Sequence, residues 1–388
     1  MSKLSYLEKL LNGVAVEWKP LDDENFFEVA NRGRKPVKAS LRTPGETPYY
    51  GANNIQDYVD GHTHKGEYVL IAEDGSASLE NYSIQYATGK FWANNHVHVV
   101  RGNSKVNTRF LYHFLTTVNF IPFLSGGGRA KLTKGKMVEI PIPIPCPENP
   151  EKSLEIQAEI VRILDSFTEL TAELTAELTA ELTARKKQYN YYRDKLLTFD
   201  EGEVEWKPLG GLAENLDSKR KPITSGLREP GEIPYYGASG IVDYVKDYIF
   251  DGDFLLVSED GANLLARSTP IAFSISGKNW VNNHAHILKF ETYAERKYVE
   301  YYLNSIDLTP YISGAAQPKL NKKNLNSIII PNPSLEGKKR IVVILDKFDA
   351  LTNSISEGLP CEIELRQQQY EYYRDLLLSF PKPEEVAA

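Results

Sequence analysis

Two patterns of hydrophobic positions follow each other along this chain of 388 residues. From Val14 to Pro145, short β-branched and aromatic runs alternate with Gly and Pro, which predicts strands and tight turns. This segment ends in the proline-rich run Ile140–Pro145, which must be extended because proline excludes a helix there. From Ser153 onward, apolar residues recur at alternating steps of four and three, the seam of a coiled coil. They are Ile156, Ile160, Ile163, Phe167, Leu170 and Leu174.

The second half of the chain copies this plan. The segment from Gly202 to Pro333 has the β-rich pattern, and a heptad spacing follows it at Ile341, Ile344, Phe348, Leu351 and Ile355. Phe167–Tyr189 and Phe348–Tyr370 have the same length, so we expect the two helical arms to pair. If residues 153–199 are all helical, the first arm is about 70 Å long.

The copying extends to individual residues. Val16–Leu21 recurs letter for letter as Val204–Leu209, and three further blocks return with few changes. These blocks are Pro44–Ala52 with Pro230–Ala238, Trp92–His98 with Trp280–His286, and Tyr189–Phe199 with Tyr370–Phe380. A period this long exceeds that of solenoid repeats, so the chain is a duplicated half-molecule. Pseudo-two-fold symmetry then predicts antiparallel pairing of the arms, and it suits a target that also has two halves.

The expected fold class is α+β, with two β-rich α/β domains separated by a long antiparallel two-helix coiled coil. The predicted boundaries are residues 1–150 for the first β-rich domain and its short N-terminal helix, and 151–200 for the first helical arm. Residues 201–335 form the second β-rich domain, and 336–388 form the second arm and tail. The N-terminal helix, around Leu7–Leu11, is expected beside the C-terminal one because it resembles Asp194–Leu197.

The two arms differ in one respect. The first contains three identical Thr-Ala-Glu-Leu copies between Thr171 and Leu182. A four-residue step drifts around the helix, so these leucines do not continue the heptad seam. The copies have two interpretations. Replication slippage could have lengthened the helix without consequence, or the copies could set the length of the arm like a ruler, each adding about 6 Å of helix. We favour the ruler. The second arm contains Pro360, which should break or kink it.

Composition and charge give weaker indications. The formal net charge of −7 argues mildly against nucleic acid as a partner, because phosphate binders are usually basic. Cys146 and Cys361 lie far apart and in no metal-binding or redox spacing. With no apolar run typical of a signal peptide or a membrane span, we expect a cytoplasmic protein that does not bind membranes.

The search for catalytic motifs gives no P-loop, no nucleophile elbow and no zinc-protease helix. His96 with His98 and His284 with His286 could each start a metal site, but neither pair has a nearby third ligand. Glu73-Asp74 and Glu259-Asp260 could supply paired carboxylates, although an acidic turn after a strand is the commoner explanation. We therefore predict no catalytic residues, no metal and no cofactor in this chain.

Positively charged clusters recur at equivalent places and predict contact with phosphates. The early clusters are Arg32, Arg34, Lys35, Lys38 and Arg42, then Lys219, Arg220, Lys221 and Arg228. The late clusters are Arg129, Lys131, Lys134 and Lys136, then Lys319, Lys322 and Lys323. Carboxamides at Asn94, Asn95, Asn282, Asn283 and Gln317 could contact adenine edges, although Asn-Asn before a strand is equally typical of a turn.

Over essentially its whole length the chain resembles the specificity subunits of type I restriction-modification enzymes. The Thr-Ala-Glu-Leu copies, flanked by Arg162–Asp165 and Tyr191–Asp194, are similar to those of the TAEL-repeat group, often called type IC. Val343–Phe348 and Tyr372–Asp375 fit the same pattern.

The resemblance implies a non-catalytic subunit in which each β-rich domain recognises one half of a bipartite site on double-stranded DNA. It also implies that the helices set the unread spacer and dock two modification subunits, which bind S-adenosylmethionine and methylate adenine. Restriction subunits with ATP- and Mg²⁺-dependent nuclease and translocase activity would join them. Two alternatives stay open: a coiled-coil interaction scaffold, and a metal-dependent nuclease using Glu73, Asp74 and the histidine pairs in duplicate.

Overall fold

The computed structural model describes residues 6–126, 130–314, 317–354 and 356–382. The chain forms two compact units. The first comprises Met1–Ala176 and Glu364–Ala388, and the second comprises Glu177–Ile363. Each unit contains one β-rich domain and part of the helical arms.

Among the described residues of the first unit, strands form two four-stranded sheets of order β2-β9-β6-β7 and β4-β3-β8-β5. The pair β3–β8 is parallel, with Tyr49 opposite Trp92, and the other pairs are antiparallel. The bounds are β2 (Phe27–Val29), β3 (Pro44–Tyr50), β4 (Ile55–Val59), β5 (His64–Lys65), β6 (Tyr68–Ala72), β7 (Ile84–Ala87), β8 (Lys90–Ala93) and β9 (Val97–Gly102).

A further ribbon pairs β1 (Val16–Pro20) antiparallel with β10 (Pro141–Pro145). The prolines of β10 cannot donate to a ladder, so this strand pairs on one side only. It is extended, as the proline-rich run predicts.

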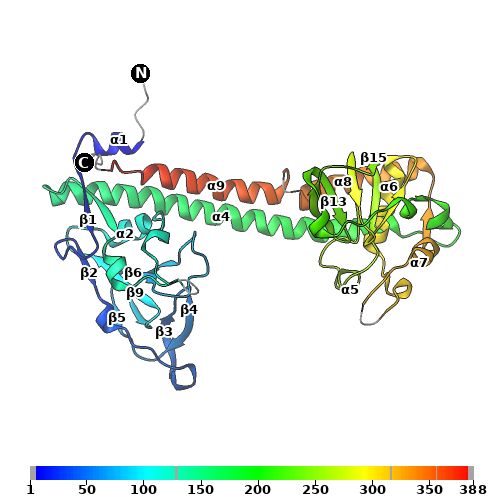
Figure 1. Ribbon diagram of the computed structural model, residues 1–388. Helices are drawn as coiled ribbons and strands as arrows, with labels where there is room; N and C mark the ends of the chain where they lie inside the picture. The colour runs from blue at the N-terminus through cyan, green and yellow to red at the C-terminus, as the bar shows by residue number, and fades with distance from the viewer. Residues whose placement is uncertain (1–5, 127–129, 315–316, 355, 383–388) are drawn as a thin grey trace. The chain divides into compact units, whose positions relative to one another are not determined.

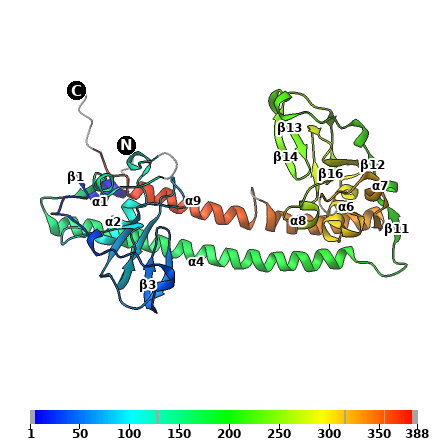
Figure 2. The same ribbon diagram turned by 60° about the horizontal axis from the view of Figure 1, so that its bottom comes forward.

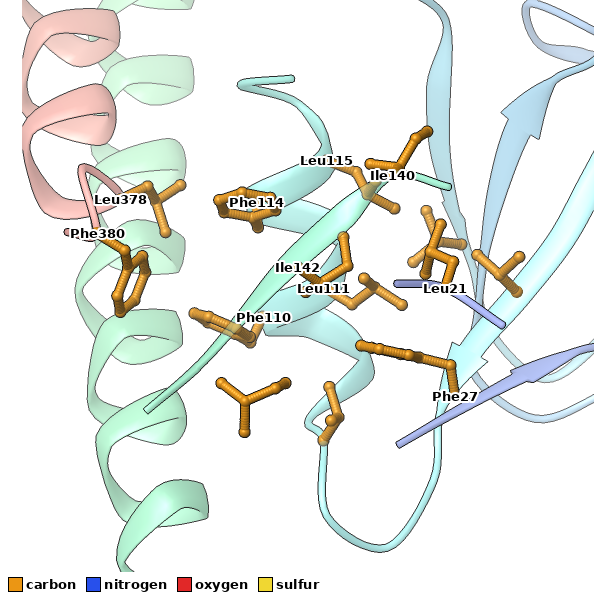
Figure 3. Packing of buried hydrophobic residues seen from close by; sticks show 14 of the residues in the cluster. Leu21, Phe27, Phe110, Leu111, Phe114, Leu115, Ile140, Ile142, Leu378 and Phe380 are labelled. Atoms are coloured by element: carbon orange, nitrogen blue, oxygen red, sulfur yellow. The ribbon is translucent and has the colours of Figure 1, made fainter. Parts of the chain in front are cut away.

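The largest hydrophobic cluster of the first unit lies between the sheet β2-β9-β6-β7 and helix α4 (Pro150–Leu197). Helix α2 (Thr108–Leu115) lies between α4 and strands β6 and β9 in Figure 1. It begins at Asn107, whose side chain accepts from the backbone N–H groups of Arg109 and Phe110. The C-terminal residues Leu378 and Phe380 pack in this core against Phe110 and Phe114 (Figure 3).

The N-terminal helix α1 (Tyr6–Leu11) joins the same core. Leu7 and Leu11 are buried in one cluster with Leu377 and Leu378 at the end of α9 (Leu359–Leu377). Figure 2 shows α1 and β1 beside this end of α9. The predicted N-terminal helix beside the C-terminal one is therefore confirmed.

The second unit repeats this topology. Its sheets have the order β12-β19-β16-β17 and β14-β13-β18-β15, and β11 pairs antiparallel with β20. The bounds are β11 (Glu205–Pro208), β12 (Glu214–Asn215), β13 (Pro230–Gly237), β14 (Gly240–Val245), β15 (Phe250–Asp251), β16 (Phe254–Ser258), β17 (Ala272–Ile275), β18 (Lys278–Val281), β19 (Ala285–Lys289) and β20 (Ile329–Asn332).

Helix α6 (Tyr293–Ser305) takes the place of α2 in this unit, and it packs on β16, β17 and α8 (Leu335–Asn353). A capping box between Thr292 and Glu295 begins α6. The remaining α-helices of the described residues are α3 (Lys134–Val138), α5 (Asn263–Ala266) and α7 (Lys322–Ser327).

In each unit, α4 pairs with a helix from the second half of the chain. In the first unit, the ring centroids of Phe167 and Tyr373 lie 6.0 Å apart, and the Thr168 and Tyr370 hydroxyls are 3.0 Å apart. In the second unit, Tyr189 and Tyr192 of α4 contact Phe348 of α8. The fold class predicted from the sequence is confirmed. The second arm is interrupted between α8 and α9, and Pro360 stands in the first turn of α9, where proline is tolerated.

An aspartate on the helical arm anchors each β-rich domain. Asp165 of α4 accepts hydrogen bonds from Arg109 Nε at 2.9 Å and His113 Nε2 at 2.7 Å, both on α2. The equivalent Asp346 of α8 accepts from the hydroxyl groups of Tyr293 at 2.9 Å and Tyr301 at 2.6 Å. The same carboxylate position thus holds the domain helix through different donors. Among the described helices, none is long and apolar enough to span a membrane.

Candidate nucleic-acid interface

A partly buried ion-pair network lies at the end of β6, an inner strand of the first β-rich domain. Glu73 directly follows β6, and its carboxylate accepts from Arg34 Nη1 at 2.6 Å and lies 3.0 Å from Lys131 Nζ. Arg34 also donates to the carbonyl of Val97 at 2.8 Å. Burial raises the pKa of Glu73, but the hydrogen bonds from Arg34 and Lys131 outweigh it, so the pKa is lowered. The network therefore holds two predicted cations and an ionised carboxylate together.

The second domain contains the same network in the same order. Glu259 follows β16 and accepts from Arg220 Nη1 at 2.7 Å, while Lys319 Nζ lies 3.2 Å away. Arg220 donates to the carbonyl of Ala285, as Arg34 does to Val97. Burial raises the pKa of Glu259, and the hydrogen bond from Arg220 with the charge of His286 brings the net shift downward.

One fully buried histidine completes each network, and the two have different neighbours. His98 Nε2 lies 2.7 Å from the Leu132 carbonyl, and its Nδ1 lies 2.9 Å from Asn31 Nδ2. Asn31 Oδ1 accepts from the Val99 amide, so its Nδ2 is the donor and His98 is neutral. Burial lowers the pKa of His98, in agreement with a neutral ring.

In the second domain, both ring nitrogens of His286 face acceptors. Nδ1 lies 2.6 Å from Asp217 Oδ2, and Nε2 lies 2.7 Å from the Leu320 carbonyl. Both ring nitrogens are therefore placed to donate, which is the hydrogen-bonding pattern of an imidazolium. Burial raises the pKa of Asp217, but the hydrogen bond from His286 and its charge lower it overall.

Asp217, Glu259 and His286 have potential ligand atoms within 4.8 Å of one another. Those atoms are already engaged: His286 uses both nitrogens, and Glu259 holds Arg220 and Lys319. A guanidinium at this distance repels a cation, so the trio fits an ion-pair network better than a metal centre. The first-domain histidines do not converge on a metal either, since His96 and His98 have separate neighbours.

A stacked arginine fixes the loop that carries the early basic cluster in each domain. The guanidinium of Arg42 lies 4.1 Å from the Tyr49 ring centre, donates to the Val37 carbonyl and pairs with Asp57 at 3.3 Å. In the second domain, Arg228 lies 4.4 Å from the ring centre of Tyr235 and pairs with Asp243 at 2.9 Å. Both arginines therefore clamp the loop onto β3 or β13.

The paired asparagines divide into one buried and one exposed residue in each domain. Asn94 and Asn282 are buried, and their side-chain oxygens accept from the backbone N–H of His96 and His284. This is the turn chemistry that the sequence left open as one alternative. Asn95 and Asn283 are exposed and available to a ligand.

The remaining predicted cations project into solvent. Arg32, Lys35, Lys38, Lys134, Lys219, Lys221, Lys322 and Lys323 are exposed, as is Gln317, and the side chains of Lys131 and Lys319 are about half exposed. Lys35, Lys38 and Arg42 line one open cavity of ≈ 470 Å³ together with Leu41 and Trp92. Lys134 and Lys322 stand at the first residues of α3 and α7, equivalent places in the repeat. Arg129 lies outside the described residues.

Two pairs of exposed residues stand in the same places of the two domains and were not among the predicted DNA contacts. His96 and His284 have half-exposed side chains held by Asp74 at 2.6 Å and Asp260 at 2.9 Å. When Nδ1 donates to the aspartate, Nε2 of the neutral ring is an acceptor, so it can donate to an anion only when the ring is protonated. Leu41 and Leu227 are the other pair. The signal that could have found them is their recurrence at equal places in the repeat.

The geometry defines a class of protein: two copies of one β-rich domain, each with a cationic loop set on a rigid internal ion-pair network. The family model described as "Type I restriction modification DNA specificity domain" matches residues 15–184 and again residues 201–365. The chain belongs to this family.

Curated relatives match the chain from end to end. A Haemophilus influenzae protein named as a type I restriction enzyme specificity subunit is 49% identical and covers 97% of this chain and 98% of its own length. The specificity subunit of the type I restriction enzyme EcoR124I/EcoR124II from Escherichia coli is 37% identical, with 100% of both chains covered.

Solved structures share the fold at low sequence identity. The S subunit of a type I restriction-modification system from M. genitalium matches with a TM-score of 0.53 at 16% identity, covering 96% of this chain and 98% of its own. A chain from a structural study of assembly and conformational transition in a type I R-M system matches with a TM-score of 0.59 at 14% identity, covering 94% and 97%. Family membership favours neither the scaffold nor the nuclease alternative.

Proposed function

We propose that this chain is the DNA-recognition subunit of a type I restriction-modification complex, with each β-rich domain reading one half of a bipartite site. The observation that carries this proposal is the duplication of exposed cations around the same partly buried ion-pair network in both domains. Cations that neutralise phosphates position a protein on DNA without reading sequence, and the neighbouring side chains then read base edges.

We infer two roles for the predicted contacts. Arg34, Arg220, Arg42 and Arg228 are held inside their own domain by carboxylates and carbonyls, so their role is to position the loops. The phosphate contacts are the exposed cations of the early and late clusters, with His96 and His284 as additional donors when their rings are protonated. Asn95, Asn283 and Gln317 are the candidates for base edges.

The proposal extends to the partners and to the subgroup. The chain contributes recognition, and two modification subunits dock on its helices, bind S-adenosylmethionine and methylate adenine. Restriction subunits that use ATP and Mg²⁺ complete the complex, which acts in the cytoplasm. The three identical copies between Thr171 and Leu182 support assignment to the TAEL-repeat (type IC) group, with the copies setting the length of the unread spacer.

Co-expression with a matching modification subunit, followed by single-molecule sequencing of host DNA, tests the proposal. The expected result is methylated adenine in a split motif with a fixed unread spacer. Absence of new methylation, with a stable complex and bound S-adenosylmethionine verified, would overturn it. Binding that is indifferent to salt would do the same, because phosphate contacts weaken as salt rises.

A further inference from the structure

Leu41 and Leu227 are the most exposed large hydrophobic side chains of the described residues, with 71% and 77% of each residue accessible to solvent. A single exposed leucine is ordinary on a protein surface. These two, however, hold the same place in the repeat, at the last residue of a 3-10 helix. The helices are η2 (Ala39–Leu41) and η6 (Ser225–Leu227). The residues before each leucine differ, Ala39-Ser40 against Ser225-Gly226, while the leucine and the arginine after it recur.

The backbone beneath each leucine is fixed from both sides. The Leu41 amide donates to the Lys38 carbonyl at 2.9 Å, and the Leu227 amide donates to the Thr224 carbonyl at 2.8 Å. The next residue is the clamped arginine, whose guanidinium lies on Tyr49 or Tyr235. The tyrosine hydroxyl in turn accepts from the amide of Val37 or Ile223 at 2.9 Å. An apolar side chain is thus held outward on a rigid support.

The surroundings of these leucines favour a polyanion as their ligand. Leu41 shares its cavity with Lys35, Lys38 and Trp92, and Lys35 Nζ lies 5.8 Å from the Trp92 ring centre. Asp60 also lines the cavity, whereas the carboxylate of Asp57 is neutralised by Arg42. In the second domain, Lys221 takes the place of Lys35, and Trp280 donates to its carbonyl as Trp92 does to that of Lys35.

We propose that Leu41 and Leu227 are apolar wedges that insert between stacked base pairs, one in each half-site. This inference rests on the proposed function. Insertion of an apolar side chain unstacks one base step at a cost of a few kcal/mol, and flanking cations hold the kinked backbone. A wedge also lowers the cost of extracting a base for chemistry by a partner enzyme, because an unstacked step is easier to open. The leucines therefore contribute both affinity and distortion, without reading a base by hydrogen bonds.

The test uses the full chain assembled with its modification subunits and a duplex that carries both half-sites from the methylation experiment. The fluorescent base analogue 2-aminopurine is placed at each base step in turn, because its emission rises when it is unstacked. The wild-type complex is expected to raise emission at one step in each half-site. Leu41→Ala should abolish the rise in the first half-site alone and weaken binding about tenfold. Leu227→Ala should do the same for the second, while Leu41→Met should retain the rise.

Leu79→Ala is the matched control, since Leu79 is an exposed leucine of the same domain outside the basic loops and should leave both signals unchanged. Wild-type binding at the split site with no step of raised emission would overturn the wedge and leave the proposed function intact. If Leu41→Ala instead weakened assembly with the modification subunits, the leucine would be a protein contact and the wedge would be wrong. Lack of any sequence-specific binding by the wild type would overturn the proposed function itself.

Discussion

Asp217 accepts a 2.6 Å hydrogen bond from Nδ1 of the buried His286, whereas the equivalent residue of the first domain is Asn31, which donates to His98. One atom of difference between a carboxylate and a carboxamide thus reverses the direction of the hydrogen bond at Nδ1 of a buried ring. The two networks are otherwise alike, each with an arginine, a glutamate and a lysine around the histidine. The repeat therefore contains a natural comparison of a buried histidine whose Nδ1 accepts a hydrogen bond with one whose Nδ1 faces an acceptor.

The first prediction concerns the exchange of Asp217 and Asn31 between carboxylate and carboxamide. Asp217→Asn should make His286 a neutral ring at pH 7, because Nδ1 would then accept a hydrogen bond from the carboxamide instead of donating one. Long-range ¹⁵N–¹H NMR spectra of the labelled chain distinguish the two protonation states. Asn31→Asp should make the opposite change at His98. If the wild-type His286 nitrogens already had the shifts of a neutral ring, the assignment would be wrong.

The second prediction concerns pH and the first unit, where burial lowers the pKa of His98 and of His113 below the ordinary 6.5. The Leu132 carbonyl opposes this shift for His98, and Asp165 opposes it for His113, without reversing either. Below pH 6.5 these two histidines bind more protons in the unfolded chain than in the folded one. The free energy of unfolding therefore decreases as pH falls. The slope is at most about 1.4 kcal/mol per histidine for each pH unit.

Hydrogen-exchange protection of β6 and β9, compared at pH 7 and pH 5.5, measures this effect by segment. We expect lower opening free energies at pH 5.5 in both strands. Replacement of the exposed His62 by Gln is the control and should leave the difference unchanged. Equal opening free energies at the two pH values would contradict the prediction.

The sequence was sufficient for the features that depend on local pattern. The β-branched and aromatic runs between Gly and Pro predicted the β-rich segments, the heptad spacing predicted the arms, and the prolines of Ile140–Pro145 predicted an extended strand. The sequence could not tell which cations are free, because that depends on groups brought close only by folding. Arg34 pairs with Glu73, which lies 39 residues away, while Lys35 beside it projects into solvent. The same limit applies to Asn94 and Asn95. They are the same residue type, but folding buries the first in a turn and leaves the second exposed.

The third prediction concerns the late loops, Gly126–Lys131 and Gly314–Lys319. An equivalent backbone hydrogen bond closes each loop. The Ser125 amide donates to the Lys131 carbonyl at 2.9 Å, and the Ser313 amide donates to the Lys319 carbonyl at 2.8 Å. Because the closures match, the loops should be exchangeable without unfolding either domain. Their sequences differ, so the exchange should move part of the base preference from one half-site to the other. Methylation sequencing of the swapped complex measures this directly.

A matched control exchanges the turns Thr88–Lys90 and Ser276–Lys278, where Gly89 and Gly277 have φ values of 70° and 75°. This exchange should leave both half-sites unchanged. Unaltered preferences after the late-loop exchange would remove these loops from base recognition and leave the exposed Asn95 and Asn283 as the candidates.

The fourth prediction concerns the Thr-Ala-Glu-Leu copies of α4. Leu174, Leu178 and Leu182 are half-buried, while Glu173, Glu177 and Glu181 are exposed, so each copy adds one similar turn to the helix. Deletion of Thr175–Leu178 removes about 6 Å of helix, which lies between one and two base-pair rises of about 3.4 Å. We expect methylation at the present spacer to be weakened, and a spacer shorter by one or two base pairs to be preferred. The change would be read from the methylated motif in host DNA. A variant with the same length but altered side chains, Thr175→Ala with Glu177→Gln, should keep the present spacer. If the deletion also kept it, the copies would only lengthen the helix and the spacer would be set elsewhere.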